Sequence, residues 1–104
     1  MAELEGILST HPVVLDAAVI GFYNKTLETE VPRAYVVCQE GAAKSEAAAM
    51  DIATFLQGRV ARHKWLRGGV RFIDSIPYSQ SGKILRRELR AVANSEQAEK
   101  LPKL

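Results

Sequence analysis

The stretch PYSQSGKILRR, residues 77–87, holds the side chains best suited to chemistry. A loop rich in serine and glycine presents one lysine, Lys83, just before a predicted helix. Gly82 lets the backbone turn tightly or approach a ligand closely, and Ser81 is expected to share in binding. The Lys83 ammonium is a compact charge on a flexible stem, suited to a phosphate or a developing oxyanion. Backbone N–H groups in the first turn of the helix could add donors.

This loop departs from the P-loop of nucleotide-binding proteins at two positions. That motif needs glycine where Pro77 stands and serine or threonine where Ile84 stands. The hydroxyl that would bind Mg²⁺ is therefore missing. From these residues alone, a solvated surface loop is favoured over an anion site.

The hydrophobic pattern predicts one α+β domain, a three-stranded sheet covered by helices in the order α-β-β-α-β-α. The first helix is expected to stop at Pro12, and Pro32 is expected to begin the second strand. Ser45 is a plausible N-cap of the middle helix. The predicted strands are residues 13–22, 33–38 and 70–73, and the later helices are residues 45–63 and 84–93. The domain is thus expected over residues 1–93, followed by a flexible tail, residues 94–104.

The two later helices are predicted to be amphipathic. The middle helix has its apolar stripe at Ala49, Ile52, Leu56 and Val60, with Phe55 on the flank. In the last helix Leu85, Leu89 and Val92 should point inward, and Arg86, Arg87 and Arg90 outward.

Composition narrows the classes of function. The single cysteine, Cys38, lies in the apolar run AYVVC, so it is expected to be a buried thiol in a reducing compartment. No apolar run approaches the roughly 20 residues that span a bilayer. A net charge of +2 is too small to indicate nucleic acid. Residues 59–90, however, carry nine Lys and Arg against only Asp74 and Glu88, which indicates an anionic partner.

A metal site is not expected. His11 and His63 each stand without a carboxylate or cysteine at ligand spacing.

Four segments resemble, in order and spacing, the C-terminal part of the adenylate-forming superfamily. PYSQSGKILRREL resembles its last core motif, which acyl- and aryl-CoA synthetases, 4-coumarate–CoA ligases, luciferases and nonribosomal adenylation domains share. The upstream stretches that agree are AELEGILSTHPVVLDAAVIG, VPRAYVV and RHKWLRGGVRFIDSIP. The resemblance runs from about residue 2 to residue 92.

The resemblance implies a function. In this superfamily a large N-terminal domain binds ATP and a carboxylic acid, and the C-terminal domain closes over it as a lid. By resemblance Lys83 bridges the carboxylate and the α-phosphate, giving an acyl-adenylate and pyrophosphate; the lid then rotates and CoA attacks. Mg²⁺ would accompany ATP without being bound by this domain. The lid is expected to be inactive without its N-terminal domain, whose pocket selects the acid.

Three further basic residues are weaker candidates. Arg59 lies where some acyl-CoA synthetases contact a CoA phosphate, and Lys64 and Arg71 could face CoA or the large domain. A solvated surface is the alternative for each of them. Trp65 is expected to pack internally or between domains.

Alternatives to the CoA-ligase hypothesis stay open. One is the end of an adenylation domain that loads a carrier protein, although those more often have Asp where Ile84 follows the lysine. Another is a non-catalytic module that binds a polyanion.

The protein is expected in the cytoplasm, with the peroxisome as the alternative because the final Pro-Lys-Leu differs from the peroxisomal Ser-Lys-Leu only at its first position.

Overall fold

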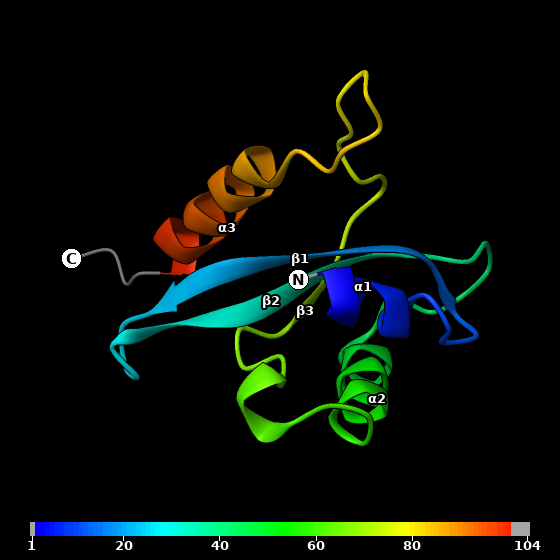
Figure 1. Ribbon diagram of the computed structural model, residues 1–104, viewed down its shortest axis with the longest axis horizontal. Coiled ribbons are helices and arrows are strands. Elements are labelled where there is room, and N and C mark those ends of the chain that lie inside the picture. Colours follow the sequence, from blue (N-terminus) through cyan, green and yellow to red (C-terminus); the bar gives the residue numbers. More distant parts are fainter. Residues whose placement is uncertain (1, 101–104) are drawn as a thin grey trace.

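The chain forms a three-stranded sheet with helices on both faces (Figure 1). The computed structural model describes residues 2–100, and side-chain burial for residues 3–95. The order of elements is the predicted α-β-β-α-β-α, so the α+β class is confirmed. The elements are α1 (Ala2–Leu8), β1 (Val14–Asn24), β2 (Thr29–Cys38), α2 (Glu46–Gln57), a 3₁₀ turn η1 (Arg62–Lys64), β3 (Val70–Phe72) and α3 (Arg86–Lys100).

The central strand is β2. It forms an antiparallel hairpin with β1, and β3 joins its other edge in parallel at Ala34–Val36 after the crossover through α2. A parallel pair needs such a crossover, since a tight turn cannot reverse the chain twice. The outer edge of β1 is left without a neighbouring strand in the described part of the chain.

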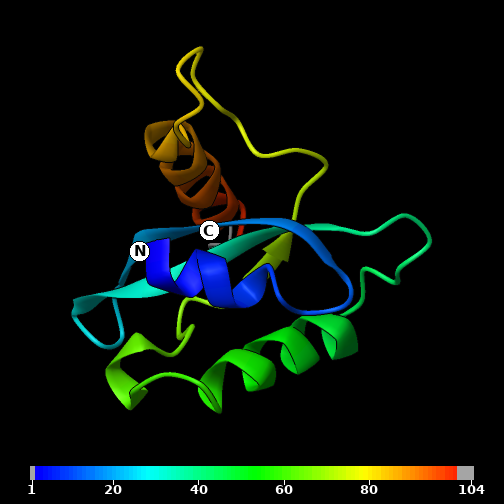
Figure 2. The same ribbon diagram turned by 45° about the vertical axis from the view of Figure 1, so that its right-hand side comes forward.

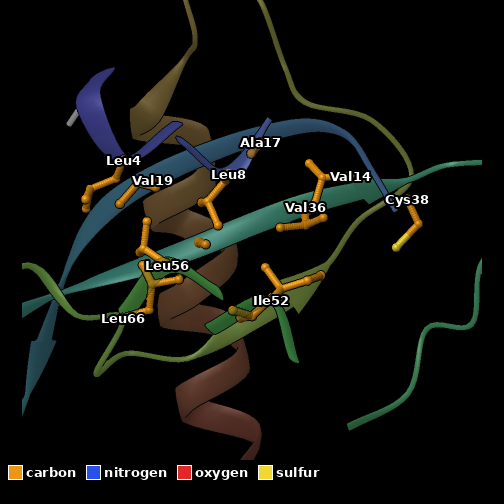
Figure 3. Close-up of a cluster of buried hydrophobic side chains, with 12 residues drawn as sticks. Leu4, Leu8, Val14, Ala17, Val19, Val36, Cys38, Ile52, Leu56 and Leu66 are labelled. Atoms are coloured by element: carbon orange, nitrogen blue, oxygen red, sulfur yellow. The ribbon is translucent and has the colours of Figure 1, made fainter. Parts of the chain in front are cut away.

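Helices cover the two faces of the sheet unequally (Figure 2). On one face α1 and α2 enclose the larger apolar cluster, which includes Leu8, Val19, Ile52 and Leu56 (Figure 3). On the other face α3 covers a smaller cluster around Ile20 and Tyr35.

The apolar composition of β1 follows from its place between two layers of helices. Ala17 and Val19 pack in the larger cluster, whereas Ala18 and Ile20 pack in the smaller one. Because helices cover both faces, the four successive residues from Ala17 to Ile20 are all buried, and an apolar run is needed there. The predicted strand is confirmed and its middle is buried, whereas Leu15 near its start is exposed.

The limits of α2 are set by its two caps. The Ser45 hydroxyl accepts a hydrogen bond from the Ala48 N–H at 3.2 Å, which confirms the predicted N-cap. The helix ends at Gln57, with Gly58 as its C-cap, so the prediction that it reaches His63 was wrong. Glycine is a poor helix former, and the chain leaves the helix there before the separate turn η1.

Pro32 lies inside β2, opposite Gly21, and the prediction that it begins the strand was wrong. Its carbonyl accepts from the Gly68 N–H at 2.9 Å, on the side of β2 that faces β3. The N and C=O of a residue in a strand point the same way, so the missing N–H also faces that side. Strand β3 begins pairing only at Ala34, and the hairpin with β1 therefore loses no bond.

The last helix starts later and runs further than predicted, from Arg86 to Lys100. Within residues 86–95 of this helix, Leu89 and Ala93 are buried, spaced i, i+4, while Val92 is 39% exposed, so the inward placement of Val92 was wrong. Part of the predicted tail is thus helical. The final Pro-Lys-Leu lies outside the described residues, and among those described no helix is long and apolar enough to cross a membrane.

Candidate functional site

Lys83 lies in a small β-hairpin, here called the lysine hairpin, residues 78–84. Tyr78 and Ile84 form an antiparallel bridge, and the Ser79 N–H donates to the Lys83 carbonyl at 2.8 Å. The Gly82 N–H closes the turn on the Ser79 carbonyl at 2.9 Å. The hairpin projects from the sheet on the side of α3 (yellow in Figure 1). Lys83 is thus held by backbone structure while its side chain is exposed.

The turn depends on Gly82. Its φ of +85° is in the left-handed region, as in hairpin loops where a turn is followed by a left-handed glycine. Nothing lies within 4 Å of the position that a Cβ would take, so the requirement is conformational and not steric. The predicted tight bend at Gly82 is confirmed.

Ser81 acts within the turn. Its hydroxyl lies 2.8 Å from that of Ser79, whose oxygen also accepts from the Lys83 N–H at 3.2 Å. The two serines therefore fix the backbone from which the Lys83 side chain emerges.

Tyr78 ties the first arm of the hairpin to the edge of β1. Its hydroxyl donates to Oδ2 of Asp16 at 2.6 Å, and the other carboxylate oxygen accepts from the Ala17 N–H at 2.9 Å. The hydrogen bond to Asp16, with burial and the negative charges nearby, raises the pKa of Tyr78 to about 12. The hydroxyl therefore stays protonated, as a donor, at neutral pH.

Arg86 ties down the chain just after the hairpin, and the prediction that it points outward was wrong. Its guanidinium forks onto the Glu5 carboxylate, with Nη1–Oε2 at 2.5 Å and Nη2–Oε1 at 3.2 Å. Nη1 also donates to the Val19 carbonyl at 2.6 Å, and Glu5 accepts from the Val19 N–H at 2.7 Å. The pair thus satisfies both backbone groups of Val19 on the outer edge of β1. The hydrogen bond to Glu5 raises the pKa of Arg86.

The structure does not bring Arg59 to Lys83. Arg59 follows α2, on the opposite face of the sheet from α3 (Figure 2). Its guanidinium lies 3.7 Å from the ring centroid of Phe55 and donates to the Phe55 carbonyl at 2.9 Å. The side chain is exposed but folded back on its own helix.

Lys64 lies beside a hollow on the same face as α1. The hollow has a volume of about 380 Å³, and its apolar lining includes Leu4, Val31 and Pro32. Lys64 Nζ is 2.6 Å from Oε2 of Glu3, and this contact lowers the pKa of Glu3. Arg71 lies in β3, half-buried, with Nη1 3.4 Å from the Val70 carbonyl. The side-chain bond described for Lys64 goes to α1 and not to the lysine hairpin.

His11 and Cys38 are buried in the fold. His11 is buried, with Nε2 2.9 Å from Asp51 Oδ2, while Nδ1 accepts from the Val13 N–H at 3.2 Å. Within residues 2–100 no group of three or more His, Cys, Asp or Glu could hold a metal ion. Cys38 is buried as predicted, and burial raises the pKa of its thiol.

Sequence reasoning missed Glu5, Asp16 and Tyr78 as supports of the site. Their partners are 62 and 81 residues away in sequence, beyond the reach of any local pattern. One signal was available: Asp16 is the only charged residue in the apolar run of residues 13–22, where a carboxylate requires a partner.

The fold and the site together define a small α+β domain that presents one lysine on a rigid hairpin. The chain matches the family of AMP-binding enzyme C-terminal domains over residues 3–83 and belongs to that family. It is 49% identical over 88 residues to the acyl-CoA ligase azaF of Aspergillus niger, covering 85% of this chain and 16% of that protein. It is 44% identical over 89 residues to a luciferin 4-monooxygenase of Photuris pensylvanica, covering 86% of this chain and 16% of the luciferase.

Solved structures agree with this assignment. The anthranilate CoA ligase AuaEII, in complex with anthranoyl-AMP, superposes with a TM-score of 0.80 at 30% identity. The superposition covers 92% of this chain and 18% of that ligase. This chain therefore corresponds to about one sixth of the curated relatives named above.

Proposed function

We propose that this chain is the lid domain of an ATP-dependent acid–CoA ligase, and that Lys83 is its adenylation lysine. The observation that carries the proposal is the lysine hairpin, in which a left-handed glycine and two serines fix the backbone of one exposed lysine. This turn holds the lysine backbone in one conformation, which suits a side chain that has to be aimed at an anion. Membership of the family and the similarity to acyl-CoA ligases supply the reaction.

The chemistry asked of Lys83 is electrostatic. A carboxylate oxygen of the acid attacks the α-phosphorus of ATP, the bond to the bridging oxygen breaks, and pyrophosphate leaves. Two anions must approach each other, and a positioned ammonium offsets their repulsion without transferring a proton. In the second step the CoA sulfur attacks the acyl carbonyl and AMP leaves. Mg²⁺ would enter with ATP.

The second step would use another face of the same domain. Lys64 and its hollow lie on the face of α1, while the lysine hairpin projects from the face of α3 (Figure 1). A single lid can serve both steps if it rotates to present each face in turn. Lys64, Arg59 and Arg71 are the candidates for a CoA-phosphate contact; Lys64 lines the hollow, whereas Arg59 is folded back on Phe55.

Separating the two half-reactions tests this function. In a full-length ligase carrying this domain, Lys83→Ala should slow pyrophosphate release from acid and ATP by about 10²–10³-fold. Thioester formation from synthetic acyl-adenylate and CoA should stay near wild type. Lys83→Arg should rescue only in part, because a planar fork is not a compact ammonium. Equal losses in both steps would refute the assigned role.

The 104-residue chain alone should fold and be inactive. Its two apolar clusters support a cooperative thermal transition, whereas the proposed ATP and acid pocket lies in another domain. Acid-dependent exchange of pyrophosphate into ATP, measured on the purified chain, would overturn this expectation.

A further inference from the structure

Two polar contacts fix the lysine hairpin to the edge of β1, one on each side of Lys83. The residues that make them, here called the edge anchors, are Glu5, Asp16, Tyr78 and Arg86. We infer that Tyr78 and Arg86 are positioning residues that aim Lys83 for adenylation; this rests on the function proposed above.

The geometry favours this role over one in general packing. Asp16 and Val19, the two attachment points, are three residues apart on one strand, which separates them by about 10 Å. The nine residues from Tyr78 to Arg86 therefore form an arch with both ends held on the same rigid edge. Residues 79–83 within the arch are classed as exposed or half-buried, so the apolar core does not enclose them.

Arg86 does more than neutralise Glu5. It also donates to the Val19 carbonyl, so its planar fork is oriented by the strand and in turn orients the first turn of α3. A lysine at this position could form one such bond but could not reproduce the fork.

Apolar packing supplies the alternative explanation. Ile76 is buried in the smaller cluster and Ile84 packs against it, so these two side chains alone could hold the hairpin. The two explanations differ in outcome: apolar packing holds the hairpin close to the sheet, whereas the edge anchors also set its direction.

The test uses two variants, each with a matched control. In a full-length ligase, Tyr78→Phe is compared with Tyr23→Phe at the exposed end of β1, and Arg86→Gln with Arg87→Gln, exposed one residue later. Tyr78→Phe removes one hydrogen bond to the Asp16 carboxylate and should slow adenylation about tenfold. Misplacing the hairpin by about 1 Å through Arg86→Gln should slow it about 100-fold. The KM values for ATP and acid, and the thioester step, should not change.

A double-mutant cycle identifies the partner of Tyr78. Asp16→Ala should slow adenylation as much as Tyr78→Phe does, and the double variant should be no slower than either. Asp16→Asn keeps an acceptor oxygen and should retain most of the rate. Arg86→Lys should fall between wild type and Arg86→Gln.

Hydrogen exchange gives a readout that does not depend on activity. In the 104-residue chain, the amides of Ser79 and Gly82 should exchange faster in Tyr78→Phe and Arg86→Gln than in the controls, while the Ala34 amide between β2 and β3 should keep its wild-type rate. Unchanged exchange at Ser79 and Gly82 would overturn the inference. Equal slowing of both half-reactions, or slowing by the control variants, would overturn it as well. If Lys83→Ala had no effect on adenylation, the proposed function would fail, and exchange alone would decide whether the edge anchors hold the hairpin.

Discussion

The two faces of the sheet are stabilised in different ways. Among residues 3–95, for which side-chain burial is described, the face under α1 and α2 has twelve buried residues in one apolar cluster, whereas the face under α3 has six. The smaller face adds polar contacts at its margin, where Arg86 meets Glu5 and Tyr78 meets Asp16. Apolar burial is non-directional, but hydrogen bonds fix orientation. The face that carries the candidate catalytic lysine thus has the smaller apolar cluster, and hydrogen bonds tie the segment that carries the lysine to β1. The other face also has polar pairs, Glu3–Lys64 and His11–Asp51, but these lie around a larger apolar cluster.

Leucine truncation on each face should show this contrast most strongly. Leu56→Ala in the larger cluster should lower the free energy of unfolding by about 4 kcal/mol, and Leu89→Ala in the smaller one by about 2–3 kcal/mol. The second loss is smaller because α3, held mostly by one cluster, can move into the space. Urea unfolding of both variants measures this. Below the unfolding transition, adenylation by the full-length enzyme should suffer in Leu89→Ala only; a reversed order in either measurement would contradict the comparison.

Gly68→Ala tests the edge of β2, where two segments of backbone meet. A Cβ at Gly68 would lie 2.9 Å from the Pro32 carbonyl oxygen and 2.9 Å from Cβ of Arg33. Backbone cannot yield as a flexible side chain can, so we expect a loss of about 2 kcal/mol in the free energy of unfolding. Gly6→Ala in α1, where nothing lies within 4 Å, is the matched control for thermal denaturation. Equal stability of the two variants would mean that the loop at Gly68 moves freely.

Gly82→Val should separate activity from stability on the smaller face. A β-branched residue is strained at a φ of +85°, at a cost of about 1–2 kcal/mol, but the exposed turn can relax without disturbing the core. Adenylation should therefore fall more, in free-energy terms, than the stability of the domain. The check is pyrophosphate release beside a thermal melt. Wild-type adenylation in this variant would refute the role of the tight turn.

The smallest effect is expected at the exposed pair Glu3–Lys64. Lys64 holds the pKa of Glu3 below its ordinary value of 4.5 in the folded chain. A lowered carboxyl pKa stabilises the fold above the unfolded pKa, and this contribution is lost as the pH falls through the folded pKa. The wild-type advantage over Glu3→Gln should therefore be present at pH 7 and be lost as the pH falls through the lowered folded pKa of Glu3. Urea midpoints of both proteins, measured from pH 7 into the acid range, test this, and an advantage that does not depend on pH would exclude the ion pair as its source.

Features that depend on nearby residues could be predicted from the sequence. The Ser45 cap, the buried strand β1 and the bend at Gly82 all follow from residue type and spacing. The extension of α3 to Lys100 could also have been predicted, because the segment ANSEQAEK is rich in residues that favour helices. It was missed because this segment has no apolar stripe. Arg59 folding back on Phe55, four residues earlier, is the kind of i, i+4 contact that helical spacing allows.

Features that depend on distant partners could not be predicted. Arg86, Arg87 and Arg90 looked alike on the predicted last helix, and only the fold shows that Arg86 reaches Glu5 and the edge of β1. The same holds for Lys64, whose partner Glu3 belongs to α1. Helical periodicity assigns a face to each residue, but it does not say which neighbour covers that face.

The bond between Glu5 and Arg86 also has a consequence for the order of folding. These residues are 81 positions apart, so their contact closes a loop that contains nearly the whole domain. Closing so long a loop in an unfolded chain costs entropy that one ion pair cannot offset, and the contact therefore has to wait until the β1–β2 hairpin and the crossover have brought the two ends together. The orientation of Lys83 would then depend on the rest of the domain being folded first, so a chain that had not completed its fold would not present this lysine in its anchored position.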